Sequence, residues 1–208
     1  MEIDPHNDAV HLRYAEVYLM PLGRHAEAIA ELKRAIELEP LSLFNNAMLA
    51  GGYMCARQFE RAVEQAEKTY DLEPSFALGR YVMGLVYNAK GMYTEVISLG
   101  EQSLQHAPTN QSYLRMTGYA YAGSGRRHEA EQVIERFRDL AKTQYVISYG
   151  IASIYAALGE RDQAFAELER AFAEHDWDLQ CLKVDPLMDP WRDDPRFAGL
   201  IKRMGLSQ

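Results

Sequence analysis

Side chains of the same character recur along this chain every 34 residues. Glycine occupies one such position four times, and arginine replaces it once: Gly23, Arg57, Gly91, Gly125 and Gly159. Alanine marks a second position, with valine as the exception: Ala28, Ala62, Val96, Ala130 and Ala164. Because glycine makes up only about 7% of residues in ordinary proteins, four matches on one grid are not expected by chance. The pattern predicts internal repeats.

Two further series predict the structure of each repeat. Tyrosine recurs on the same grid, three residues after a small residue: Ala50 and Tyr53, Gly84 and Tyr87, Gly118 and Tyr121, Ala152 and Tyr155. This spacing places both residues on one helix face, where the small residue admits a neighbouring helix and the tyrosine fills the space beside it. Glycine can adopt the positive φ that ends a helix, and proline cannot continue one. The glycines therefore predict turns between paired helices, and Pro40, Pro74 and Pro108 predict the ends of the second helices.

We place five helix–turn–helix units at residues 8–42, 43–76, 77–110, 111–144 and 145–178. The first unit is one residue longer than the others, and we expect the extra residue in the turn near Met20–Leu22. The fourth unit is the least regular, because Phe137 replaces a small residue and Lys142 replaces proline. We therefore expect a bend or looser packing across 137–145.

The two ends of the chain depart from the full repeat. Residues 1–7 are interpreted as the end of a truncated preceding repeat, because residues 2–5 resemble residues 37–40. Near the other end, Asp194 followed by Pro195 predicts a helix start. An apolar stripe follows, and Gly205 closes it: Phe197, Leu200, Ile201 and Met204. Residues 179–208 are therefore expected to fold back as a C-terminal capping segment over the last repeat.

These series resemble the tetratricopeptide repeat (TPR), a helix–turn–helix unit of about 34 residues. The resemblance implies an all-α fold: a right-handed TPR superhelix, or α-solenoid, of about five repeats with a C-terminal capping helix. The tail segments 184–186, 193–197 and 202–206 resemble the C-terminal ends of bacterial multidomain signalling proteins. In those proteins TPR arrays follow a DNA-binding, nucleotide-cyclase or kinase domain, so the resemblance implies a sensory or regulatory module.

Charge and composition exclude several functional classes. The net charge of −8 argues against a nucleic-acid surface, because phosphate binding needs clustered lysine and arginine. No apolar run is long enough for a membrane span, and Cys55 and Cys181 suggest neither a zinc site nor a disulfide framework. The compartment is not fixed by these features; the cytoplasm is favoured, with the periplasm as the alternative.

No arrangement of side chains indicates catalysis. The six histidines lack the spacing of a metalloprotease site. The acidic cluster near the C-terminus, from Asp185 to Asp194, lacks the spacing and the central glycine of a calcium-binding loop. Gly123–Arg127 lies on the repeat grid as a turn and lacks the ending of a Walker phosphate loop. We therefore expect no catalytic residue, cofactor or metal.

The TPR resemblance implies that the first helices line a concave groove for a partner. On the register above, nine residues fall there: Arg13, Phe44, Met48, Tyr81, Leu85, Asn88, Arg115, Tyr119 and Tyr149. The set is aromatic and apolar, and it lacks the basic clamp with which chaperone-binding TPR proteins grip a peptide carboxylate. The sequence thus predicts a non-catalytic protein-interaction scaffold that binds a peptide or an amphipathic helix. The alternative is a regulatory or self-associating module of a larger bacterial signalling protein, forming a homo-oligomer.

Overall fold

The computed structural model describes residues 6–207, which fold into two compact units. Unit 1 contains the described residues up to Ala89 together with Cys181–Pro186, and unit 2 contains Lys90–Gln180 together with Leu187–Ser207. The ordered elements of this described part are helices, with no strand. The predicted remnant of a preceding repeat at residues 1–7 lies outside the described residues, except for His6 and Asn7.

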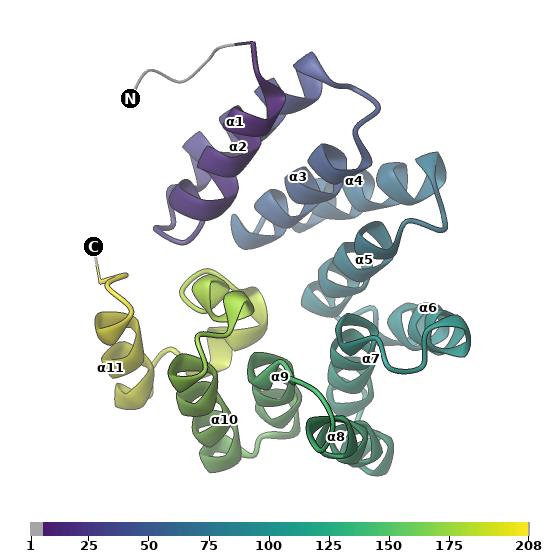
Figure 1. Cartoon of the computed structure of the whole chain (residues 1–208), viewed down its shortest axis with the longest axis vertical. Helices are drawn as coiled ribbons and strands as arrows, with labels where there is room; N and C mark the ends of the chain where they lie inside the picture. Colours follow the sequence, from purple (N-terminus) through teal and green to yellow (C-terminus); the bar gives the residue numbers. More distant parts are fainter. Residues whose placement is uncertain (1–5, 208) are drawn as a thin grey trace. The chain divides into compact units, whose positions relative to one another are not determined.

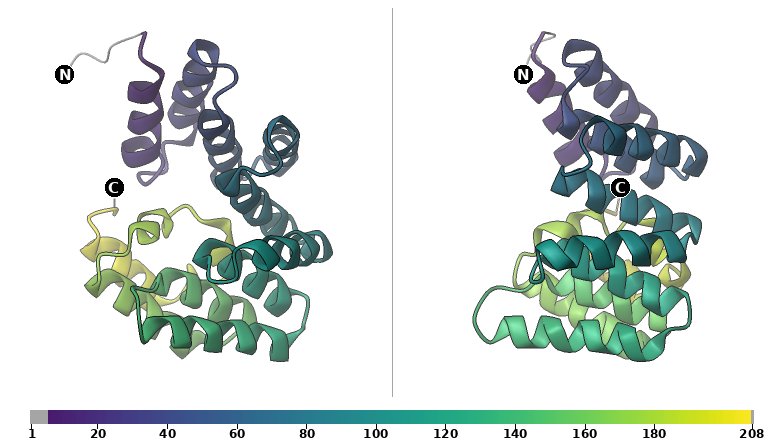
Figure 2. Two further views of the ribbon diagram at one scale, coloured as in Figure 1. Left: turned by 45° about the vertical axis from the view of Figure 1, so that its right-hand side comes forward. Right: turned by 90° about the vertical axis from the view of Figure 1, so that its right-hand side faces the viewer.

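Successive helices pack against each other within each unit (Figures 1 and 2). The first helix α1 (Asp8–Arg13) of unit 1 continues directly into the π-helix η1 (Tyr14–Leu19). The other first helices of this unit are α3 (Leu43–Cys55) and α5 (Ala77–Lys90). The second helices α2 (His25–Leu38) and α4 (Phe59–Leu72) lie between them in the sequence. Unit 2 holds α6 (Tyr93–His106), α7 (Gln111–Gly123), α8 (Arg127–Ala141), α9 (Ser148–Leu158) and α10 (Arg161–Ala173). The 3-10 helices η2 (Trp177–Cys181) and η3 (Pro186–Trp191) precede the last helix, α11 (Pro195–Arg203). The predicted all-helical class is confirmed.

The turn between the two helices of each pair has a left-handed residue at the glycine position. The φ angles of Gly23, Gly91, Gly125 and Gly159 lie between 77° and 80°. Arg57 adopts the same conformation with φ 61°, although its Cβ makes this region unfavourable. The 34-residue series therefore specifies a left-handed backbone conformation at this position and does not require glycine itself.

Arg57 contacts a segment from the far end of the chain. Its Nη1 donates hydrogen bonds to the carbonyl oxygens of Cys55 and Val184, both at 2.6 Å. Lys183 Nζ donates to the carbonyl oxygen of Leu22 at 3.1 Å, at the neighbouring turn. Residues 181–186 thus belong to unit 1, and the arginine at the glycine position is one of the side chains that hold them there.

The extra residue of the first unit lies inside its first helix, so the prediction of a longer turn near Met20–Leu22 was wrong. Tyr14–Leu19 forms a π-helix, in which the N–H of Met20 bonds to the carbonyl oxygen of Ala15 at 2.9 Å. A π-turn accommodates one more residue than an α-turn. Ala15 and Leu19 both remain buried, so the insertion keeps the apolar face of the helix on the core.

Small residues on the first helices permit close approach, as predicted. A Cβ at Gly118 would lie 2.5 Å from Ile154 Cδ1 and 2.9 Å from Val133 Cγ1. The tyrosines of the series also make a polar contact that was not predicted. Tyr121 donates from its hydroxyl to Glu101 at 2.7 Å, and Tyr87 donates to Glu67 at 2.9 Å. Each of these bonds joins a first helix to the second helix of the pair before it.

The fourth unit is irregular in its connection and closely packed in its core. α9 begins at Ser148, three residues after the predicted start of the fifth unit at 145. The Gln111 side chain holds the intervening segment, donating to the carbonyl oxygen of Tyr145 at 2.9 Å and accepting from the N–H of Ile147 at 2.7 Å. Phe137 is 0% exposed and lies in the unit 2 core, so the expectation of looser packing was wrong there.

The helix that was predicted near the C-terminus packs along α10. Asp194 caps it by accepting from the N–H of Arg196 at 2.9 Å, as predicted. Arg196 pairs with Asp162 at 2.8 Å, and Arg203 pairs with Glu169 at 2.8 Å, each across 34 residues of sequence. α11 therefore starts one repeat length after α10, as the second helix of an incomplete sixth unit would.

Replacing Gly118 with alanine should lower the free energy of unfolding by about 1–3 kcal/mol, because the new Cβ overpacks against Ile154 and Val133. Gly199→Ala is the matched control, since a Cβ at this exposed position of α11 would meet nothing within 4 Å. It should raise stability by up to about 1 kcal/mol through helix propensity. Urea unfolding of both variants measures the difference, and equal effects would contradict close packing at Gly118.

Replacing Asp194 with alanine should lower the unfolding midpoint in a pH-dependent way. Hydrogen bonds from Arg196 lower the pKa of Asp194 to about 2. Its carboxylate therefore stabilises the fold above the unfolded pKa of about 3.9, and this contribution is lost as the pH falls towards 2. Asp194→Asn keeps a capping oxygen without the charge, so its deficit should be smaller at neutral pH. Thermal melts from pH 6 to pH 3 should show each deficit shrinking; a constant deficit for Asp194→Ala would contradict the assignment.

Candidate protein-interaction surfaces

Side chains from the first helices of unit 1 share one face. The guanidinium carbon of Arg13 on α1 lies 5.8 Å from the ring centre of Phe44 on α3. Asn45 on α3 donates to Asp8 on α1 at 3.0 Å, which fixes the two helices against each other. Arg13 is exposed, and Phe44 and Met48 are half-buried, so all three retain surface that a partner can reach.

The predicted residues on α5 differ in their exposure. Tyr81 and Leu85 are half-buried. Asn88 is only 2% exposed, so its side chain is part of the interior of unit 1. Tyr81 and Leu85 remain candidates for partner contact, and Asn88 is left out because a ligand cannot reach it in this conformation.

In unit 2, two of the three predicted residues are buried against each other. Arg115 on α7 is 5% exposed, and its guanidinium carbon lies 4.7 Å from the ring centre of the fully buried Tyr149 on α9. Arg115 Nη1 also pairs with Asp178 at 3.2 Å. These two side chains join α7 to α9 from within, and only Tyr119, which is half-buried, keeps accessible surface.

Asp176 takes part in this interior arrangement and was not predicted. Its carboxylate accepts from the N–H groups of Tyr149 and Asp178, both at 3.0 Å, and burial raises its pKa. The N-cap of α9 is Ile147, which supplies no side-chain acceptor. Asp176 thus caps α9 from a distant segment. The free N–H groups at a helix start need acceptors. The absence of a capping side chain at Ile147 was therefore the signal in the sequence that a distant residue caps α9.

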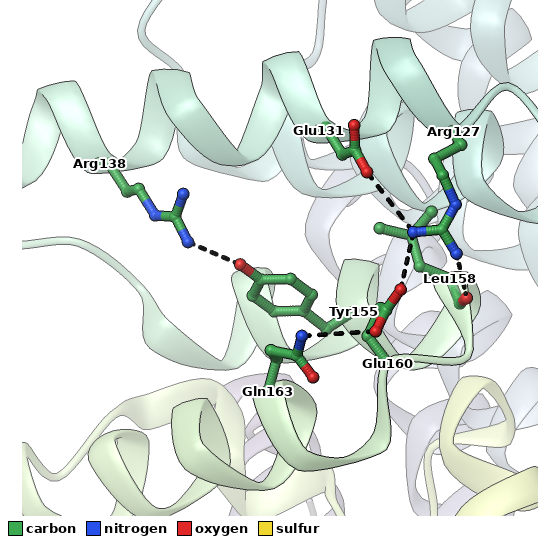
Figure 3. Close-up of polar contacts among 7 residues, drawn as sticks. All are labelled: Arg127, Glu131, Arg138, Tyr155, Leu158, Glu160 and Gln163. Carbon is green, nitrogen blue, oxygen red and sulfur yellow. Dashed lines mark hydrogen bonds and ion pairs between the residues drawn. The ribbon is translucent and has the colours of Figure 1, made fainter.

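A hollow of 560 Å³ lies on unit 2 between α8 and the adjoining ends of α9 and α10 (Figure 3). Apolar surface from Ile134, Tyr155 and Leu158 lines part of it, and charged and amide side chains line the rest. None of the nine residues predicted for the groove lies there. The volume falls within the range of about 300–1,000 Å³ that is usual for ligand pockets.

Ion pairs occupy both ends of the hollow, and Figure 3 shows those of Arg127. At one end Arg127 Nη1 bonds to Glu160 at 2.7 Å and to Glu131 at 3.5 Å, while Nη2 donates to the carbonyl oxygen of Leu158 at 3.2 Å. At the other end Arg138 donates to the hydroxyl of Tyr155 at 2.7 Å and pairs with Glu135. Both arginines are therefore already bonded to groups of the chain, and the hollow offers no concentrated charge for an ionic ligand.

The described residues hold no cluster of three or more histidine, cysteine or acidic side chains with the arrangement of a metal site.

Burial raises the pKa of Tyr155 and of Glu167, and both are also influenced by the charge of Arg138. In both cases burial, which disfavours the charged form, is the main cause of the raised pKa. Within residues 6–207, no helix combines the length and the apolar character that crossing a bilayer requires.

Comparisons with known proteins agree with this geometry. A family model described as tetratricopeptide repeat matches residues 9–40. Comparison with curated proteins gives no match. Among solved structures, the chain is similar to TTC0263, a thermophilic TPR protein of Thermus thermophilus, with a TM-score of 0.67 and 22% identity, covering 94% of this chain and 100% of that one.

Two further solved structures show the same fold. PilW, a widely conserved type IV pilus biogenesis factor, has a TM-score of 0.59 at 16% identity, covering 87% of this chain and 84% of that one. YrrB, a TPR protein with an unusual peptide-binding site, has a TM-score of 0.50 at 15% identity, covering 96% of this chain and 94% of that one. Residues 9–40 thus match the tetratricopeptide repeat, and the chain has the all-helical repeat fold of solved TPR proteins.

Proposed function

We propose that this chain is a non-catalytic scaffold that binds a peptide or a helix of a protein partner on the surface of its first helices. Proteins with this fold generally mediate protein–protein interactions. The described side chains offer accessible aromatic and apolar surface at corresponding places on successive first helices. The first-helix surface comprises six of the nine predicted residues, taken in each unit by itself: Arg13, Phe44, Met48, Tyr81 and Leu85 in unit 1, and Tyr119 in unit 2.

The observation that carries the proposal is the partial exposure of Tyr81 and Tyr119. Tyr87 and Tyr121, the tyrosines of the repeat series, bond to glutamates of the preceding second helices. Tyrosine suits a binding surface because it supplies a large contact area at a low cost in conformational entropy. The peptide-binding site of YrrB, which shares the fold, supports a peptide as the ligand class.

A second candidate function is self-association through η1. Val17 and Tyr18 of this π-helix are 46% and 50% exposed, and the Tyr18 ring stacks on that of Tyr14 with centres 5.4 Å apart. Neighbouring exposed apolar side chains of this kind often mark an association surface. Here the scaffold would join copies of itself or belong to a larger regulatory assembly.

The first-helix surface can be tested with peptides that the wild-type protein selects from a random library. Tyr81→Ala combined with Tyr119→Ala should weaken the selected peptides roughly tenfold or more, as expected for loss of aromatic hot spots. Tyr70→Ala is the matched control, because Tyr70 is half-buried on the second helix α4. Calorimetric titration measures each affinity, and melting curves confirm folding. Undiminished binding by the folded double variant would exclude this surface.

Self-association can be measured independently by sedimentation equilibrium. If η1 mediates it, the wild-type protein should form dimers with rising concentration, and Tyr18→Ser should remain monomeric because its exposed ring is lost. Leu41→Ser removes another exposed apolar side chain of unit 1 and should leave dimerisation unchanged. A wild-type protein that stays monomeric at high concentration would rule out this second function.

A further inference from the structure

Trp177 and Tyr145 are the two most exposed aromatic side chains of the described residues, at 62% and 55%. Trp177 begins η2 and stands between Asp176 and Asp178 in the sequence, and Tyr145 belongs to the segment that leads into α9. Both lie in unit 2. Tryptophan is highly buried on average in folded domains, so an indole ring as exposed as that of Trp177 departs from this tendency.

Hydrogen bonds fix the backbone on both sides of this surface. Asp176 accepts from the N–H groups of Tyr149 and Asp178, so the residues that flank Trp177 are tied to the start of α9. Gln111 bonds to the backbone of Tyr145 and of Ile147. Trp177 and Tyr145 are thus presented from ordered backbone, which lowers the entropy cost of binding a ligand there.

Acidic residues lie near Tyr145 and adjoin Trp177 in the sequence. Burial, followed by the charges of Asp176, Glu174 and Asp178, raises the pKa of the Tyr145 phenol, so these three acidic groups lie close enough to act on it. Arg115 beneath the surface pairs with Asp178 at 3.2 Å, and Arg170 pairs with Glu174 at 3.0 Å. Asp176 accepts hydrogen bonds from backbone N–H groups. The chain as a whole carries a net charge of −8, which also favours a basic ligand.

Trp191, the other tryptophan of the chain, shows how this protein covers an indole ring. The guanidinium carbon of Arg161 lies 5.0 Å from the ring centre of Trp191, and its Nη1 lies 3.7 Å from a carboxylate oxygen of Asp194. The same combination of ring, arginine and acid recurs at Phe165, where Arg196 lies 4.2 Å from the ring centre and also bonds to Asp194. Among the described residues no arginine or lysine covers the ring of Trp177 in this way.

We propose that Trp177, Tyr145, Glu174 and Asp178 form a second interaction surface, the Trp177 patch, which binds an arginine side chain of a basic partner peptide. The arginine would lie over the indole face, where the negative face of the ring attracts the cation. Its N–H groups would donate to Asp178 and Glu174, so that acid, arginine and ring combine as they do in the ion pair of Arg161 with Asp194 beside Trp191. This surface shares no residue with the first-helix surface, so neither assignment depends on the other.

The probe is an uncharged glycine-rich peptide that carries two arginines, with a glutamate peptide of equal length as the control. The chain has only two tryptophans, so its two indole N–H signals in a ¹H–¹⁵N spectrum report on the two rings separately. The arginine peptide should shift the Trp177 signal and leave that of the buried Trp191 in place, and the glutamate peptide should shift neither. A shift confined to Trp191, or equal shifts with both peptides, would overturn the proposal.

The affinities of variants for the arginine peptide then show which side chains contribute to binding. Trp177→Ala should weaken the arginine peptide by roughly 3- to 30-fold, the range expected for loss of a cation–π contact, while the melting temperature stays unchanged because the ring is exposed. Trp177→Phe should retain part of the affinity. Leu41→Ala, which truncates the most exposed large apolar side chain of unit 1, and the Tyr81 and Tyr119 variants should bind as the wild type does. Wild-type affinity in a folded Trp177→Ala protein would refute the Trp177 patch.

Discussion

A left-handed residue separates the two helices of each pair, and the rest of the structure depends on this turn. It reverses the chain within a few residues, so that α3 packs on α4, α7 on α8 and α9 on α10. At Arg57 the chain keeps the conformation without glycine, and the side chain that this introduces binds the segment 181–186. The turn is thus maintained even where the residue type changes, because a different conformation would shift the register of both helices.

The same geometry decides which side chains are available for binding. Residues facing the paired helix must be small, as Gly118 shows, and the tyrosines beside them reach back to glutamates on the preceding second helix. What remains accessible on the first helices includes Phe44, Tyr81 and Tyr119. The packing pattern therefore leaves accessible aromatic side chains on the first helices, where we propose that a partner binds.

Much of the fold could be predicted from the sequence, because turn chemistry and small-residue spacing are local and repeat. The failures involve contacts that bring distant segments together. Arg115 and Tyr149 have the right phase for the groove, but Asp178, far along the chain, pairs with Arg115, and both predicted residues are buried. The π-helix of the first unit absorbs an insertion that residue counting could not place. α11 starts one repeat length after α10, as the next second helix would. Asp193 stands where the turn glycine is expected, so the sequence did not reveal that α11 continues the repeat.

We propose two interaction surfaces of different chemistry: the first-helix surface, which is aromatic and apolar, and the Trp177 patch, which is aromatic and acidic. The central claim is that the first helices, and not the second, contact the partner. Backbone ¹H–¹⁵N chemical-shift mapping of a library-selected peptide tests it most directly. The account predicts the largest shifts around Phe44, Tyr81 and Tyr119, with α4 and α8 little affected. Shifts concentrated on α4 and α8, or in the hollow beside Tyr155, would contradict it.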